Sequence, residues 1–139
     1  MSLLDLNFDD IQDLKAAEGG EQKIRVTNSK VGFGKDSGNP YYMINFELPG
    51  VPNSKDFNYL IMLPTEAMDK KKAEAKGRAL KAFCKTFNVD LAGLWLKLKD
   101  AVDRNQPTEI DSPVGAEGWA ILGTEEDDYG IKNRIKKFI

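Results

Sequence analysis

Residues 131–139 read IKNRIKKFI, a short segment in which apolar and basic side chains alternate. Successive side chains of a β-strand point to opposite faces, so Ile131, Asn133 and Ile135 share one face of the predicted strand. The basic side chains share the other face: Lys132, Arg134 and Lys136. A row of cations suits a polyanion such as a phosphate backbone. The alternative is that lysines on an edge strand only discourage aggregation.

Three earlier segments also alternate and predict strands: residues 22–33, 41–48 and 56–63. In the second of them, YYMINFEL, Tyr42 falls on one face with Ile44 and Phe46. That grouping leaves Tyr41 on the opposite face. The segments between these strands are rich in turn-forming residues and predict loops at residues 34–40 (GKDSGNP) and 49–55 (PGVPNSK).

Two helical patterns follow the third predicted strand. Thr65 comes directly after a proline and predicts the N-cap of a first helix, in which apolar residues repeat with helical spacing as far as Phe87. The second pattern repeats apolar residues from Leu91 to Val102, and we expect Trp95 on its core-facing stripe.

Residues 104–117 predict a loop, and residues 118–124 and 129–139 predict a closing hairpin. We expect Trp119 to alternate with Ile121 toward the core rather than to be exposed. Three strands, a helical insertion and two more strands are the order of an OB-fold. The sequence therefore predicts a mainly β fold, a five-stranded OB-fold barrel with helices between its third and fourth strands.

An acidic arm precedes this predicted domain. Residues 1–21 hold six acidic residues against Lys15, a local charge of −5, so the rest of a chain of net charge −2 carries +3. We predict two units: residues 1–21, an arm whose apolar side chains pack on the domain, and residues 22–139, the OB-fold domain.

The composition argues against most enzyme chemistry. The chain has no histidine and one cysteine, Cys84, which lies on a helical apolar stripe and predicts core packing. The usual zinc sites and histidine-activated nucleophiles are therefore not available. The acidic run at residues 125–128 predicts a solvated hairpin tip, because Mg²⁺ sites normally gather carboxylates from separated elements. We expect no enzyme activity, no metal site and no cofactor.

The chain is predicted to be a cytoplasmic protein, in contact with no membrane. No segment approaches the roughly 18 apolar residues that a membrane-spanning helix needs. The N-terminal sequence MSLLDLNFDDIQDL is acidic, unlike a basic leader followed by an apolar run.

Several segments, taken in order, resemble the single-stranded-DNA-binding proteins of tailed bacteriophages. These segments are LDLNFDDI in the arm, the Gly19-Gly20 pair before a basic strand, GKDSGNPYYMINFEL, and the ending GWAILGTEEDDYGIKNRIKKFI. The resemblance implies an OB-fold and a bacterial host cytoplasm. Many proteins of this functional class end in an acidic tail that recruits partners, whereas this sequence ends directly after its last predicted strand. Either such a tail has been removed from this sequence, or partners are recruited differently, for example through the acidic arm.

Sequence-tolerant binding of single-stranded DNA needs cations along the phosphates and aromatic faces against the bases. We predict the cations at Lys23, Arg25, Lys35, Lys132, Arg134 and Lys136. Any one of them is equally compatible with an ordinary solvated side chain.

Three aromatic residues are candidate DNA contacts. Tyr41 is the preferred stacking platform because strand parity places it opposite the apolar face. Phe33 lies beside a glycine at the first predicted loop, where no packing role is evident. Phe57 and Tyr59 share a face with Ile61 and are expected in the core, although the Tyr59 hydroxyl could reach the groove.

The leading hypothesis is a non-catalytic phage protein that binds single-stranded DNA during replication or recombination, with proteins of those processes as partners. The alternative is an OB-type interaction or structural module that does not bind nucleic acid. A Mg²⁺-dependent nuclease is the least favoured class. Oligomeric state does not follow from the sequence.

Overall fold

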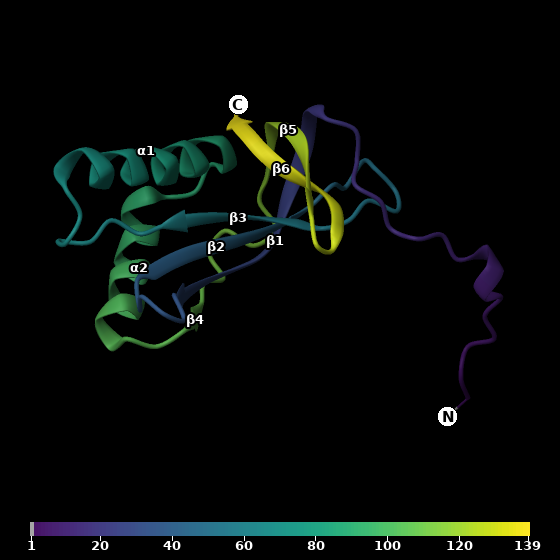
Figure 1. Cartoon of the computed structure of the whole chain (residues 1–139), viewed down its shortest axis with the longest axis horizontal. Coiled ribbons are helices and arrows are strands. Elements are labelled where there is room, and N and C mark those ends of the chain that lie inside the picture. Colours follow the sequence, from purple (N-terminus) through teal and green to yellow (C-terminus); the bar gives the residue numbers. More distant parts are fainter. Residues whose placement is uncertain (1) are drawn as a thin grey trace.

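The computed structural model describes residues 2–139 and contains six antiparallel strands in one sheet, with two helices packed against it (Figure 1). The strands are β1 (Gly20–Phe33), β2 (Pro40–Glu47), β3 (Phe57–Met62), β4 (Thr108–Glu109), β5 (Glu117–Asp127) and β6 (Gly130–Phe138). The helices, α1 (Lys70–Phe87) and α2 (Leu91–Arg104), lie between β3 and β4. A 3-10 turn, η1 (Phe8–Asp10), lies in the N-terminal arm.

Strand β1 organises the sheet because it pairs with three other strands. Its first half pairs with β5, and its second half pairs with β2 on one side and β4 on the other. The hydrogen-bonded order is β3-β2-β1-β5-β6. A bulge between Val26 and Asn28 shifts the register with β2, and it leaves both Val26 and Ser29 on the buried face.

The two ends of this order, β3 and β6, approach each other through side chains. The rings of Tyr59 and Phe138 meet edge to face with their centroids 5.2 Å apart. Within residues 2–139 the hydrogen-bonded sheet is open at this seam. The protein therefore has a mainly β fold with an open sheet, and the contact between β3 and β6 is compatible with a barrel-like arrangement.

The core lies between the inner face of the sheet and helix α1. Phe46 of β2 stacks on Phe57 of β3 and on Phe87 of α1, with ring centroids 5.7 and 5.5 Å apart. Tyr42 is fully buried, and its hydroxyl donates a hydrogen bond to Ser29 Oγ at 2.9 Å. Burial raises the pKa of the Cys84 thiol to about 11, which agrees with the predicted packing role.

Both helices begin at an aspartate and end at an asparagine. The Asp69 carboxylate accepts a hydrogen bond from the Lys72 backbone N–H at 2.8 Å, so the predicted N-cap at Thr65 was wrong. The sequence offers two capping residues, and the helix begins at the one nearer its apolar stripe. Asn88 and Asn105 end the helices in the left-handed conformation, with φ of 55° and 52°. Trp95 of α2 is partly buried against the core, as expected.

Residues 104–117 are not entirely a loop. Thr108 and Glu109 form strand β4, which pairs with Val31 and Lys30 of β1. A two-residue strand carries no alternation long enough to be recognised in a sequence. The sheet therefore has six strands where the sequence predicted five.

The N-terminal arm contacts the domain only at its end. We expected its apolar side chains to pack on the domain, but they are exposed in the structure: Leu3, Leu4, Leu6, Phe8, Ile11 and Leu14. Figure 1 shows the arm extending away from the sheet. Ala17 is buried, and its backbone bonds to the side chain of Asn133. The Ala17 N–H donates to Asn133 Oδ1 at 2.8 Å, and Asn133 Nδ2 donates to the Ala17 carbonyl at 2.9 Å. The prediction that Asn133 faces inward and bonds to backbone is confirmed.

Candidate nucleic-acid interface

The outer face of the sheet points away from the core and carries most of the candidate DNA-binding residues. We divide it into two halves along β1. The aromatic half comprises Asn28, Lys30, Tyr41, Met43, Asn45, Asn58, Leu60 and Met62, from the second half of β1 with β2 and β3, and we count with it Lys35 of the loop that joins β1 to β2. The charged half comprises Lys23, Arg25, Glu47, Glu117, Trp119, Ile121, Lys132, Arg134, Lys136 and Lys137, mainly from the first half of β1 with β5 and β6.

Tyr41 lies across a glycine in the aromatic half. It is opposite Gly32 in the register of β1 with β2, and a Cβ atom at Gly32 would clash with the Tyr41 ring and hydroxyl. Only glycine leaves room for the ring to cover the neighbouring strand. Tyr41 is half-buried while Tyr42 is fully buried, so the predicted parity of β2 is confirmed. The ring forms a fixed apolar surface on the outside of the sheet.

A row of amides crosses the aromatic half beside this ring. Asn28, Asn45 and Asn58 occupy matching positions of three adjacent strands. The Asn45 side chain donates a hydrogen bond to the Asn28 carbonyl oxygen. Amide groups both donate and accept hydrogen bonds, so the row offers partners to base edges or phosphates. These three asparagines were not among the predicted DNA contacts.

Apolar side chains lie between the amide row and Tyr41. Met43 and Leu60 are opposite each other on β2 and β3, and Leu60 is 49% exposed. Leu60 and the Tyr41 ring therefore belong to one apolar surface of the kind against which bases can stack.

Two cations of the aromatic half are exposed and form no ion pair within residues 2–139. Lys30 is outward on β1 opposite Met43, with Glu109 across from it on β4. Lys35 lies in the loop between β1 and β2. Neither ammonium has a carboxylate partner that a phosphate would first have to displace.

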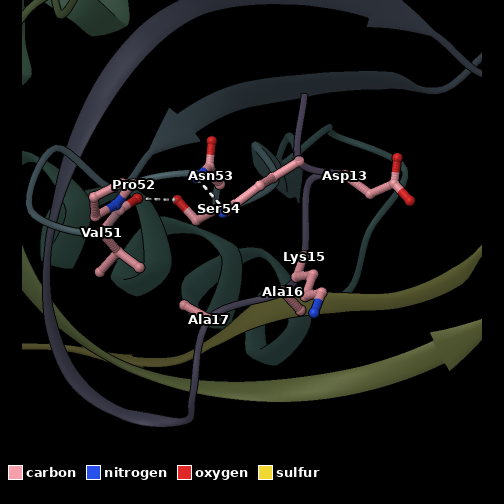
Figure 2. Close-up of a pocket in the computed structure, with 9 residues that line it drawn as sticks. Asp13, Lys15, Ala16, Ala17, Val51, Pro52, Asn53 and Ser54 are labelled. Carbon is pink, nitrogen blue, oxygen red and sulfur yellow. Dashed lines mark hydrogen bonds between the residues drawn. The ribbon is translucent and has the colours of Figure 1, made fainter. Parts of the chain in front are cut away.

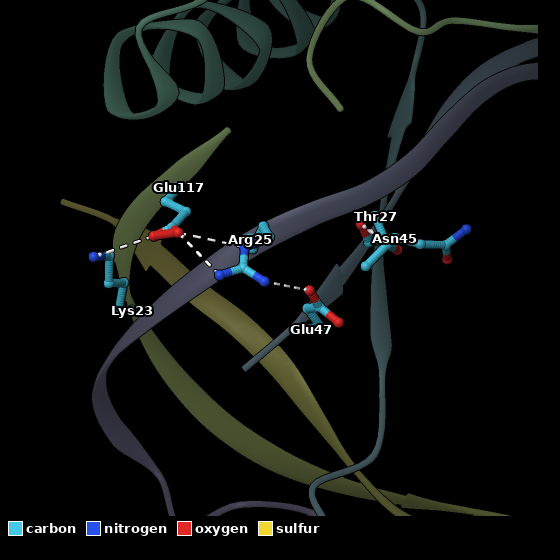
Figure 3. Close-up of polar contacts among 6 residues, drawn as sticks. All are labelled: Lys23, Arg25, Thr27, Asn45, Glu47 and Glu117. Atoms are coloured by element: carbon cyan, nitrogen blue, oxygen red, sulfur yellow. Dashed lines mark hydrogen bonds and ion pairs between the residues drawn. The ribbon is translucent and has the colours of Figure 1, made fainter. Parts of the chain in front are cut away.

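The central cations of the charged half are already paired (Figure 3). Arg25 bonds to Glu47 at 2.9 Å and to Glu117 at 3.1 Å, and Lys23 bonds to Glu117 at 3.1 Å. Hydrogen bonds from Lys23 and Arg25 hold the pKa of Glu117 below its usual range. The Glu117 carboxylate therefore compensates the charge of both cations.

The last strand is split between paired and unpaired cations. Lys132 lies 3.0 Å from Asp127 and 3.5 Å from Glu125, and its hydrogen bond with Asp127 raises its pKa. Arg134 and Lys136 are exposed and form no ion pair in the described part of the chain. A bulge at Ile121/Leu122 places both Lys136 and Lys137 outward. The predicted row of cations exists, but one of its members is neutralised.

Two predicted aromatic contacts lie on the inner side of the sheet. Phe33 ends β1 rather than standing in the loop, and it packs partly against the core. Tyr59 is partly buried against Phe138, and this burial raises the pKa of its hydroxyl. Neither ring faces the surface that carries Tyr41.

Trp119 lies on the outer face, so its predicted place in the core was wrong. Helix α1 approaches β5 so closely at Gly118 that a Cβ atom there would meet Thr86 and Phe87. This approach fixes Gly118, Ala120 and Leu122 as the inward positions, although two of them are small. Trp119, directly between inward residues, is 50% exposed. The sequence signal was present in the alternation of Gly118 and Ala120.

A shallow pocket marks where the arm joins the domain (Figure 2). Residues 12, 13 and 15–17 line one side, and the turn at residues 51–54 lines the other. Lys15 donates its backbone N–H to the Asn53 carbonyl at 2.9 Å and accepts from the Lys55 N–H at 2.8 Å. These two backbone hydrogen bonds attach the arm to the turn at Lys15, and the pocket lies where the arm and the turn meet.

In residues 2–139, no group of three or more carboxylate or thiol side chains is placed to hold a metal ion. Neither α1 nor α2, nor any other described helix, is long and apolar enough to cross a membrane. No protein-family model matches this sequence, and no curated protein matches it either.

Proposed function

We propose that this chain is a non-catalytic protein that binds single-stranded DNA with little sequence preference, on an OB-type barrel. The main observation in support is the position of Tyr41, whose ring lies across Gly32 on the outer face of the sheet. Exposed Lys30 and Lys35 accompany the ring, and the three amides lie beside it. This combination of a fixed ring with free cations is what sequence-tolerant binding requires.

The strand order supports the OB-type assignment. Strand β1 pairs with both β2 and β5, and β3 approaches β6 at the seam. In this interpretation, β4 is an addition beside β1. OB-folds bind oligonucleotides on their second and third strands, which here are β2 and β3 of the aromatic half.

The biological setting rests on the resemblance of the sequence segments to phage proteins. On that basis the protein acts in replication or recombination of phage DNA, in the cytoplasm of a bacterial host. Its partners would be proteins of those processes.

The test is a fluorescence titration with poly-dT at several salt concentrations. Quenching of intrinsic tryptophan or tyrosine emission, reversed by salt, is the expected result. Poly-U in the same titration measures preference for RNA. Absence of any salt-sensitive binding to either polymer would reject the proposal. Incubation of labelled DNA with Mg²⁺ tests the nuclease alternative, and we expect the DNA to remain intact.

A second candidate function, a protein-interaction module, is favoured by the exposed arm. Its apolar side chains alternate with acids, and Leu3 is 96% exposed. Deletion of residues 2–14 tests whether the arm is part of the DNA site, because this cut keeps the contacts of Lys15 and Ala17. We expect DNA affinity to stay equal or rise, since the deleted segment is acidic. A large loss of DNA binding in the folded deletion variant would place the arm in the DNA site.

A further inference from the structure

Trp119 has the exposure of a binding residue and no packing role that explains it. The neighbouring positions Ala120 and Leu122 supply the inward side chains of β5. The ring lines a shallow pocket with Thr86 and Ile139. Half of the tryptophan is open to solvent.

The surroundings of Trp119 supply positive charge. Lys23 is directly opposite it on β1, and Arg25 is the next outward residue of that strand. Lys137 of β6 lies opposite Ile121, the next outward residue of β5. Two carboxylates, Glu21 and Glu117, also border the pocket. The ring therefore lies among three cations, of which Lys23 and Arg25 are paired with Glu117 and Arg25 also with Glu47, while Lys137 forms no ion pair within residues 2–139.

Trp119 of β5 and Tyr41 of β2 lie on the same, outer face of the sheet, each opposite a residue of β1. Trp119 is opposite Lys23 and Tyr41 is opposite Gly32, so nine positions of one strand separate the two rings. At about 3.3 Å per residue this spacing is about 30 Å. The bulge near Asn28 keeps Arg25 and Lys30 outward between them. A single DNA strand laid along β1 would pass from one ring to the other.

We infer that Trp119 is a second base-stacking site, so that the DNA path extends from the aromatic half across β1 onto the charged half. This inference rests on the proposed function. A strand on this path meets Tyr41 first, over unpaired cations, and Trp119 second, where phosphates compete with Glu117 for Lys23 and Arg25. Long strands then gain a contact that short strands cannot reach.

The experiment uses the Trp95→Phe variant, in which Trp119 is the remaining tryptophan of the two in the sequence. Oligothymidylates of about 4 and about 16 nucleotides span the range of OB-fold site sizes. We expect the long oligomer to quench Trp119 emission and shield it from acrylamide, and the short one to do neither at equal saturation.

Affinities of substituted chains provide the second measurement. Trp119→Ala is expected to weaken binding of the long oligomer by about 5- to 150-fold and to leave the short one unchanged. Trp119→Phe should retain most of the affinity, and it serves as the test if the alanine variant fails to fold.

The outcomes separate the inference from the proposed function. If no form of the protein binds either oligomer, the proposed function fails. If the wild type binds, Tyr41→Ala weakens binding, and Trp119→Ala binds both lengths like the wild type, the inference alone is overturned.

Discussion

The aromatic and charged halves of the outer face differ in what their cations already contact. In the aromatic half, Lys30 and Lys35 have no ion-pair partner within residues 2–139. In the charged half, Lys23 and Arg25 share Glu117, and Lys132 is held by Asp127. The half with more basic residues therefore offers less uncompensated charge at its centre. A count of lysines and arginines along a strand does not measure the field that a phosphate meets.

The comparison depends first on the register of β2, which decides whether Tyr41 or Tyr42 faces outward. Tyr42→Ala should lower the free energy of unfolding by about 3–5 kcal/mol, because it removes a fully buried ring and leaves Ser29 without its donor. Urea denaturation measures this change. Tyr41→Ala is the matched control and should cost much less. The opposite ranking would mean that the faces of β2 are exchanged.

The next largest effect concerns the ring of the aromatic half. Tyr41→Ala should weaken binding of poly-dT by about 1–3 kcal/mol, while Tyr41→Phe should be nearly neutral, because stacking uses the ring face. Fluorescence titration at fixed salt gives both values. A Phe variant as weak as the Ala variant would show that the hydroxyl binds the DNA and that Tyr41 is not a stacking platform.

The charged half is tested by the salt dependence of binding. Each phosphate contact on a single strand contributes a log–log slope of about −0.7. Replacing Lys132, Arg134 and Lys136 together with Ala should flatten the slope by about 1.4 if Lys132 stays with its acids, and by about 2 if all three bind. Lys132→Ala alone distinguishes these cases. An unchanged slope in the folded triple variant would remove β6 from the interface.

The smallest expected effect is a gain. Glu117→Gln should strengthen DNA binding about two- to fivefold at low salt, because it frees Lys23 and Arg25 without changing the side-chain shape. Substitution tests the charge of Glu117 directly, whereas Lys23 and Arg25 lower the pKa of this carboxyl and so oppose its protonation by acid. Glu74→Gln on α1 is the matched control, with no effect expected. Weaker binding of Glu117→Gln would show that Glu117 positions the cations rather than competing for them.

Alternation predicted the inner face of the sheet well and the outer face less well. The parity of Tyr41 and Tyr42 followed from the apolar set of one strand. Trp119 was misplaced because the inward residues of β5 include Gly118 and Ala120, which are small since α1 lies against them. The apolar pattern alone places Trp119, the largest apolar residue of the strand, in the core. In the folded protein the close approach of α1 decides which residues of β5 face inward.

The ion pairs of the charged half and the role of Gly32 opposite Tyr41 could be recognised only in the folded structure. Glu117 is 92 residues from Arg25 in the sequence, and only the pairing of β1 with β5 brings them together. The position of Gly32 beneath Tyr41 likewise follows from the register of β1 with β2. Strand register between distant segments, rather than local propensity, determined these features.

The hydrogen bonds of Asn133 have a consequence for the order in which the chain becomes structured. Its amide contacts Ala17 across 116 residues of sequence, and it also donates to the Gly123 carbonyl at 3.3 Å. During synthesis, Ala17 leaves the ribosome long before its partner exists. The bonds of the Lys15 backbone to the turn can therefore form first, and the bonds of Ala17 form only when the C-terminal strand is complete. Asn133→Ala should speed hydrogen exchange at the Ala17 amide and leave exchange at the Val31 amide unchanged. If exchange at Ala17 is also unchanged in the variant, another contact holds this segment in place.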